Sequence, residues 1–259
     1  MSNFNKVPEL LEINLGFPDF RFKCNEIQNL PFSQVETLLK ALPKEIKNVG
    51  IGGSPLRFNW WKDFVDLLSI LDKNIILVEK VSQINISKMH FTKQKGIKFV
   101  LEVENLNQVR KGLKFKNDCE IFLISLGNAS KDRKLLDFLK KAGISFNIEA
   151  ITWGSNRVET KRIKQFLEWW GEVDSKCGII TNKVIGLGID GNFYPCVALQ
   201  FPEFKLGSIF RDDFSEIVKS YSRFKEKLIC QYCCQARSWS KYKVLNRDFL
   251  CFVCAEKHK

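Results

Sequence analysis

The sequence predicts an α/β fold with a parallel sheet, because residues 8–174 alternate between short β-rich runs and segments with helical periodicity. Six β/α units in a row fit an open doubly wound sheet or a partial barrel, and periodicity alone does not choose between them. Near Asp174 the alternation stops and the cysteines begin, so we expect one domain over 1–174 and a second over 175–259. The expected strands are Leu10–Leu15, Lys47–Gly52, Asn74–Val81, Ile97–Val103, Glu120–Leu126 and Ile144–Ile151.

Helix boundaries are signalled between these strands. Ser33 and Glu36 have the spacing of a capping box ahead of an apolar helix over Val35–Leu42. Further along, apolar residues repeat at helical spacing before Gly143, which stands where a left-handed C-terminal cap belongs.

Composition sets the broad class. The 259 residues are 45% hydrophobic and 27% charged, as in ordinary globular proteins. The sequence has no apolar run near the ~20 residues of a membrane span, and Met1–Lys6 lacks the layout of a signal peptide. We therefore expect a cytoplasmic protein without membrane contact.

The charge is unevenly distributed. The formal net charge is +12, and residues 221–259 carry nine Lys and Arg against three acids, a net +6. Such a tail attracts polyanions, so nucleic acid is a candidate partner. A Lys-rich surface that only promotes solubility is the alternative.

Cysteines crowd into the C-terminal third, where seven of the nine follow residue 176. In a reducing compartment this crowding favours metal ligation over disulfides. Cys230-x-x-Cys233 and Cys251-x-x-Cys254 suit one tetrahedral four-sulfur site. Upstream, Asp190-Gly191 predicts a hairpin turn between apolar runs, which would deliver Cys196 to the end of a strand.

Several of these segments together resemble a known family. Gly191-Asn-Phe-Tyr-Pro-Cys196, then Lys205-Leu-Gly-Ser-Ile209, then Phe214-Ser-Glu-Ile-Val218 and Cys230-x-x-Cys233 resemble the SPASM/twitch extension of radical S-adenosylmethionine (radical SAM) enzymes. Gly52-Gly53-Ser54-Pro55 is similar to that family's Gly-Gly-Glu-Pro segment, which binds S-adenosylmethionine. The resemblance implies a partial (β/α)6 barrel followed by a small cysteine-rich α+β metal module, with auxiliary iron–sulfur clusters.

Departures from the family pattern change the expected function. The family's C-x3-C-x2-C loop would fall within Gly16–Leu30, where Cys24 is the single cysteine. The Gly-Gly-Glu-Pro carboxylate, which in the family holds the amino group of S-adenosylmethionine, is replaced by Ser54. The resemblance therefore implies a degenerate member without radical catalysis of its own.

The metal assignment follows in part from the family. One four-sulfur site would use Cys230, Cys233, Cys251 and Cys254, and a second would use Cys177 and Cys196 with Cys234 as a further ligand. Cys234 could equally be spare. The spacing suits Zn²⁺ and the resemblance suits a [4Fe–4S] cluster, so both remain open.

Three functional hypotheses follow. The first is a non-catalytic or auxiliary binding subunit that uses the old barrel cleft beside a protein partner, such as an intact relative. The second is an RNA-associated protein with a basic, zinc-ribbon-like tail. The third is an enzyme with repurposed chemistry at the barrel mouth, where Glu102 and Glu104 alternate at a strand end, although such acids commonly pair with Lys instead. In the Trp60-Trp61 pair we expect one ring in the core and one at an interface.

Overall fold

The computed structural model describes part of the chain as two compact units. The described residues are 7–15, 30–103, 105–115, 121–126, 134–135, 137–139, 141–143, 146–150, 184–197, 200 and 202–228. The first unit takes in residues 1–78, 85–97 and 178–230, and the second takes in 79–84, 98–177 and 231–259. The domain boundary expected at residue 174 lies outside the described residues and stays a prediction.

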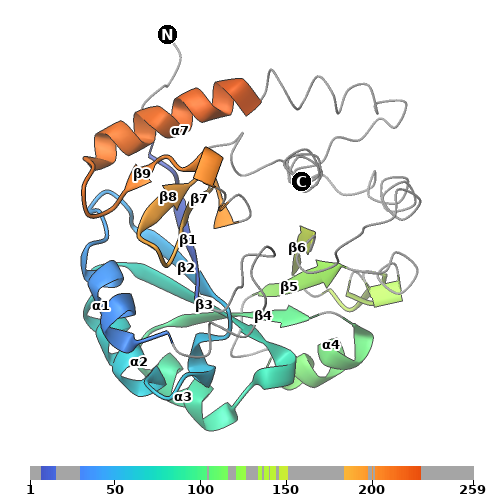
Figure 1. The fold of residues 1–259 in the computed structure, drawn as a ribbon. Coiled ribbons are helices and arrows are strands. Elements are labelled where there is room, and N and C mark those ends of the chain that lie inside the picture. Colours follow the sequence, from blue (N-terminus) through green and yellow to red (C-terminus); the bar gives the residue numbers. More distant parts are fainter. Residues whose placement is uncertain are drawn as a thin grey trace, which may run out of the picture. The chain divides into compact units, whose positions relative to one another are not determined.

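The first unit is built on a mixed sheet with the strand order β3-β2-β1-β7-β8-β9 (Figure 1). Strands β1, β2, β3 and β7 run parallel, and β8 and β9 continue the sheet antiparallel. Strand β7 therefore extends the parallel sheet beside β1, with Leu11 opposite Ile185. Its strands are β1 (Leu10–Asn14), β2 (Asn48–Gly52), β3 (Asn74–Lys80), β7 (Val184–Leu187), β8 (Asn192–Tyr194) and β9 (Gly207–Ser208).

Helices flank these strands in sequence. They are α1 (Phe32–Lys40), α2 (Trp61–Ile70), α3 (Ile86–Gln94) and α7 (Phe214–Leu228), with short 3-10 turns η2 (Pro55–Arg57) and η6 (Pro202–Phe204). Strands β1, β2 and β3 alternate between buried and more exposed residues: Leu11 and Ile13 are buried on β1, whereas Glu12 and Asn14 are half-buried. Strand β7 is buried at all four of its positions.

The second unit holds a parallel ladder in the order β6-β5-β4. It contains the last two residues of β3, then η3 (Val81–Gln83), β4 (Lys98–Val103), α4 (Leu106–Gly112), η4 (Leu113–Phe115), β5 (Ile121–Leu126) and β6 (Phe146–Ala150). All six strands expected from the sequence are present, each within two residues of its expected ends.

The capping box expected at Ser33 and Glu36 is wrong. Helix α1 begins at Phe32, and its N-cap is Pro31, two residues before Ser33, with no side-chain capping bond. Ser33 therefore lies inside the first turn, and Glu36 forms an ion pair with Lys40 at 2.7 Å. Asparagine caps helices elsewhere: Asn85 Oδ1 accepts from Lys88 N at 3.1 Å. Gly143 has φ 63°, which confirms the expected left-handed position.

None of the helices among the described residues is long and apolar enough to cross a membrane.

Candidate metal centre and barrel-mouth residues

The turn after β2 carries the segment that resembles Gly-Gly-Glu-Pro. Gly53 and Ser54 both have left-handed backbones, with φ 87° and φ 55°. Ser54 is buried at 3% exposure, and its Oγ has no hydrogen-bond partner among the described residues. A non-glycine residue in this conformation costs about 1–2 kcal/mol, and an unpaired buried hydroxyl adds to that cost. Such strain persists only where the surroundings impose it.

Neighbouring side chains do impose this turn. Lys88 on α3 donates from Nζ to Leu56 O at 2.6 Å, and its ammonium lies 4.9 Å from the centre of the Trp61 ring. Arg57 N donates to Ser54 O at 3.1 Å. Charge-assisted bonds of the Lys88 kind are about twice as strong as neutral ones. The turn is thus fixed from α3 and from its own 3-10 helix.

Trp60 and Trp61 both serve contacts within the chain. Trp60 stacks on Phe58 with ring centroids 4.4 Å apart and donates from Nε1 to Leu30 O at 2.9 Å. Trp61 packs edge-on against Phe91 and under Lys88. Both rings are half-buried. The expectation of one core ring and one exposed ring is therefore wrong for this pair.

The residues of this turn do not fit the family's way of holding S-adenosylmethionine. A carboxylate pairs with the ligand's ammonium, whereas the Ser54 hydroxyl is neutral and buried. Gly52 leaves room on β2: an added Cβ would lie 3.9 Å from Asn14 and from Val78, which is ordinary contact. At this strand end Ser54 supplies a neutral hydroxyl where the resembling family would have a carboxylate. Cys24 lies outside the described residues.

The acidic candidates at the barrel mouth belong to the second unit. Glu102 on β4 has a side chain 14% exposed, with Oε1 3.9 Å from Lys80 Nζ on β3. Glu79, beside Lys80 in sequence, is buried at 3% exposure. For such an acid, an ion pair with a residue on the neighbouring strand is the structural alternative to a catalytic role. Glu104 lies outside the described residues, so the proposed pair of acids stays a prediction.

The hairpin expected at Asp190-Gly191 is confirmed. Gly191 N donates to Gly188 O at 3.0 Å and Gly188 N donates to Asn192 O at 2.9 Å, while Gly191 has φ 75°. This is a turn followed by a left-handed glycine, a common three-residue hairpin loop. Asp190 organises it, since its carboxylate accepts from Asn192 N at 3.1 Å and from Tyr194 OH at 2.9 Å.

Cys196 follows directly from this hairpin. It is 6% exposed and forms no disulfide within the part of the chain that the structure describes. Gly186 on β7 is packed against its backbone: an added Cβ there would lie 2.5 Å from Val197 N and 2.8 Å from Cys196 O. No residue but glycine fits without moving that peptide. A buried thiol on a fixed strand end suits a soft metal centre such as an iron–sulfur cluster or Zn²⁺.

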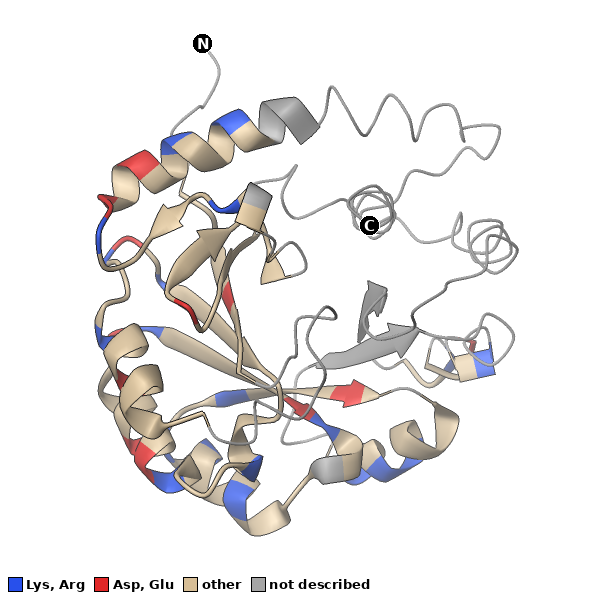
Figure 2. Ribbon diagram, viewed as in Figure 1, with Lys and Arg blue, Asp and Glu red and all other residues tan. Residues whose placement is uncertain are grey.

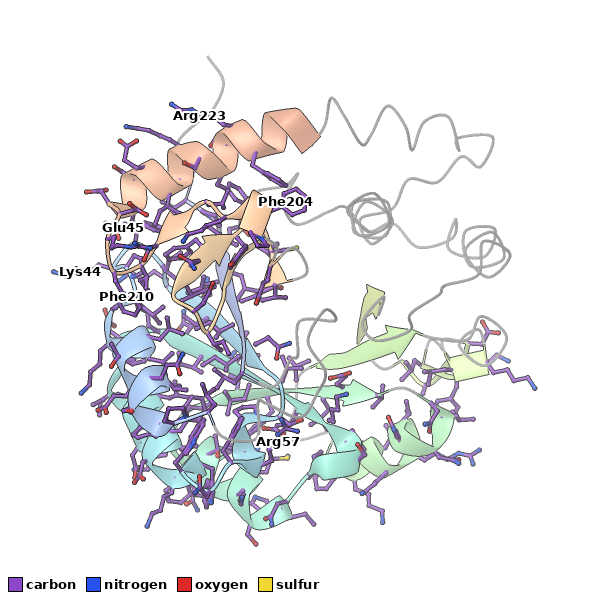
Figure 3. The ribbon with its side chains drawn as sticks, viewed as in Figure 1. Lys44, Glu45, Arg57, Phe204, Phe210 and Arg223 are labelled. Atoms are coloured by element: carbon purple, nitrogen blue, oxygen red, sulfur yellow. The ribbon has the colours of Figure 1, made fainter. Side chains whose placement is uncertain are left out.

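Helix α7 packs on the same hairpin. Tyr221 is fully buried, and its hydroxyl donates to Val184 O on β7 at 2.8 Å. The ring centroids of Phe214 and Phe193 are 5.6 Å apart, and those of Phe224 and Phe204 are 5.4 Å apart. Figure 3 labels Phe204 beneath helix α7. These contacts fix the helix that ends at Leu228, two residues before Cys230 in sequence.

The other predicted ligands lie outside the described residues. They are Cys177, Cys230, Cys233, Cys234, Cys251 and Cys254. Within the described part of the chain no group of three or more His, Cys, Asp or Glu could hold a metal. Ligand pairing therefore stays a prediction. Sequence reasoning missed Gly186, Lys88 and Tyr221; a glycine inside a strand pattern was the one available signal.

Comparison with known proteins gives a domain match for one segment and a likeness in fold for the chain. Residues 177–244 match the SPASM family, described as an iron–sulfur cluster-binding domain. The chain as a whole shares the fold of the solved structures described below. The predicted partial barrel is thereby confirmed, since neither unit closes its described strands into a ring. No curated protein matches the sequence.

Solved structures with this fold are distant in sequence. anSMEcpe with bound AdoMet is 14% identical with a TM-score of 0.56, and 85% of this chain covers 83% of that one. anSMEcpe with AdoMet and the Kp18Cys peptide is 15% identical with a TM-score of 0.54 and the same coverage. SuiB of Streptococcus suis is 14% identical with a TM-score of 0.50; 82% of this chain spans 66% of SuiB. At these identities the likeness concerns the fold.

Proposed function

We propose that this protein is an auxiliary, non-catalytic binding subunit with a SPASM metal centre and a radical SAM fold that no longer performs radical chemistry. The observation that carries the proposal is Ser54. At the position where the resembling family places the carboxylate that holds the cofactor, the chain has a buried hydroxyl in a strained, well-supported turn. The loop Gly16–Leu30, with one cysteine, supports the same conclusion from the sequence.

The replacement of the family's carboxylate by Ser54 matters because recognition of the ammonium group of S-adenosylmethionine depends on charge. A carboxylate–ammonium contact is stronger than a hydrogen bond to a neutral hydroxyl, and three thiolates are needed to hold a cluster that leaves one iron open. Two separate requirements for S-adenosylmethionine chemistry are therefore unmet by these residues. The barrel would then serve to bind, and the partner would be a protein that supplies the chemistry.

The SPASM domain would hold an iron–sulfur cluster, with Zn²⁺ as the alternative occupant. The SPASM match favours iron–sulfur, whereas the two C-x-x-C pairs suit Zn²⁺ equally well. Thiolate ligands require a reducing environment, which fits a cytoplasmic location. Anaerobic purification with metal analysis and an absorption spectrum distinguishes the two occupants. A broad absorption band at ~400 nm indicates an iron–sulfur cluster, and a colourless protein with stoichiometric zinc indicates Zn²⁺.

The test of the non-catalytic role is reductive cleavage of S-adenosylmethionine. The full chain, reconstituted anaerobically with iron and sulfide, is incubated with S-adenosylmethionine and dithionite, and 5′-deoxyadenosine is measured. We expect none above the level without protein, and no saturable S-adenosylmethionine binding by calorimetry. Production of 5′-deoxyadenosine that depends on the protein would overturn the proposal.

RNA association is a second candidate, supported by the +6 tail over residues 221–259. Where α7 is described, its residues are mixed in sign, and red and blue segments alternate with tan along its ribbon (Figure 2). Glu216 forms an ion pair with Lys219, and Arg223 is exposed one turn later. Any polyanion site would therefore depend on the residues after α7. The RNA-association hypothesis predicts RNA binding that weakens steeply as the salt concentration rises, and absence of RNA binding at low salt would exclude it.

A further inference from the structure

Strand β7 anchors two segments that lead to predicted metal ligands. Gly186 contacts the Cys196–Val197 peptide, and Val184 accepts the hydrogen bond of Tyr221 from α7. The two anchor points are two residues apart on one strand, within the first unit. Strand β7 is also hydrogen-bonded to β1, so its own position is set by the parallel sheet.

The contact at Gly186 is one of space. An added Cβ would approach Val197 N to 2.5 Å and Cys196 O to 2.8 Å, closer than side-chain carbons approach such atoms. Both are backbone atoms, so no side-chain rotation could relieve the overlap. Gly186 is not among the glycines with positive φ, so conformational freedom is not what the position requires. Any larger residue must displace the peptide that carries Cys196.

We propose that Gly186 is a positioning residue for Cys196 as a metal ligand, and that Tyr221 fixes to the same strand the helix that leads to Cys230. The inference rests on the SPASM metal centre of the proposed function. Ligands already held in place pay less ordering entropy when the metal binds. Supporting residues of this kind typically change metal affinity 10–100-fold when replaced.

The test uses the full chain and a matched pair of glycine substitutions. Gly186→Ala introduces the overlap, whereas Gly50→Ala on β2 is the control, because an added Cβ there lies 3.7 Å from Leu10 Cδ1. Each protein is reconstituted anaerobically with iron and sulfide and, separately, loaded with Zn²⁺. Metal release to a chromogenic chelator is timed well below the melting temperature. We expect release at least ~10-fold faster from Gly186→Ala and unchanged from Gly50→Ala.

A second measurement separates positioning from general destabilisation. Cys196→Ser removes the ligand itself, so Gly186→Ala should add nothing to metal release in that background, since coupled residues are non-additive. Tyr221→Phe keeps the buried ring but removes the bond to Val184 O, and should also accelerate release. The cluster's absorption and EPR spectra should change in Gly186→Ala, a signature that loss of stability alone does not produce.

Each outcome decides the matter. Wild-type release rates and spectra in Gly186→Ala, or fully additive effects with Cys196→Ser, would overturn the role of Gly186. If Gly186→Ala does not fold, an unchanged release rate in Tyr221→Phe overturns the shared anchoring on β7. If the wild-type chain retains neither iron nor zinc, the metal centre itself fails. Cleavage of S-adenosylmethionine, by contrast, would overturn the non-catalytic role and leave this inference standing.

Discussion

The turn after β2 and the hairpin between β7 and β8 belong to one sheet, but they differ in how their left-handed backbone positions are held and in the chemical groups they carry. At the β2 turn Gly53 and Ser54 have left-handed backbones, and Lys88 supports the turn through Leu56 O. At the hairpin, both the shape and the chemical group are present, since Gly186 and Asp190 frame a buried Cys196. The two regions therefore differ in how a left-handed position is accommodated: by a serine held from outside at the β2 turn and by a glycine at the hairpin.

Strain is the quantity that distinguishes the two regions. The hairpin places glycine at its left-handed position, Gly191, where it costs little. The β2 turn places serine at φ 55° with an unpaired hydroxyl, and it relies on neighbouring contacts to hold that conformation. Substitutions should therefore damage the hairpin and, at Ser54, improve the turn.

The largest effect is expected at the hairpin, from Gly191→Val. A β-branched residue is strained at φ 75°, and the added Cβ would lie 2.9 Å from Phe210 Cδ2. Together these should lower the free energy of unfolding by about 2–3 kcal/mol. Urea unfolding followed by circular dichroism measures the change. Gly96→Val is the control, because Gly96 has φ 77° and nothing within 4 Å of an added Cβ. Equal losses in the two variants would show that Phe210 contributes nothing.

The next effect concerns the support of the β2 turn. Lys88→Met keeps most of the side-chain volume but removes the bond to Leu56 O and the contact with the Trp61 ring. We expect a loss of about 1.5–3 kcal/mol, typical of a hydrogen bond to a charged group. Lys62→Met, at an exposed position on α2, is the control and should change stability little. If both variants unfold at the wild-type urea concentration, Lys88 does not hold the turn.

Ser54→Gly should move stability in the opposite direction. Glycine accepts φ 55° without the steric cost that serine pays, and the substitution also removes the unpaired hydroxyl. A gain of about 1 kcal/mol is expected. Ser54→Ala removes the hydroxyl but keeps the backbone strain, so its gain should be smaller. A loss of stability in Ser54→Gly would mean that the hydroxyl has a stabilising partner.

The strands were predictable from the sequence because buried strands of a parallel sheet are short runs rich in apolar residues, which stand out between segments of helical periodicity. The hairpin was predictable for a similar reason, since Asp190-Gly191 encodes its own turn locally. Helix α1 was not placed correctly, because the prediction relied on the spacing of Ser33 and Glu36, whereas the helix starts two residues earlier, after Pro31, without a side-chain cap.

The supports of the site were the hardest part to predict. Lys88 lies 32 positions from Leu56 and Tyr221 lies 37 from Val184, so no local pattern relates them. Gly186 gave a weak signal as a glycine in an apolar run, but its contact with Cys196 exists only after β7 and β8 have paired. The cysteine ligands themselves are visible in sequence because C-x-x-C spacing encodes a site locally.

Low pH should destabilise helix α7, which packs on the hairpin between β7 and β8. Asp213 precedes the helix, and hydrogen bonds from the Ser215 hydroxyl and amide, the latter at 2.7 Å, lower the pKa of its carboxyl below 3.8. A lowered folded-state pKa contributes stability that is fully present above the unfolded value and is lost as the pH falls through the folded value.

Because Asp213 is exposed, the effect of replacing it should be the smallest of the four. Asp213→Asn keeps a capping side chain without the charge, so its stability should be lower than that of the wild type near neutral pH. The difference should shrink once the pH falls below about 4 and vanish below the lowered folded-state pKa of Asp213. Urea midpoints across that range provide the measurement, and a constant difference between the two proteins would show that the Asp213 charge does not stabilise α7.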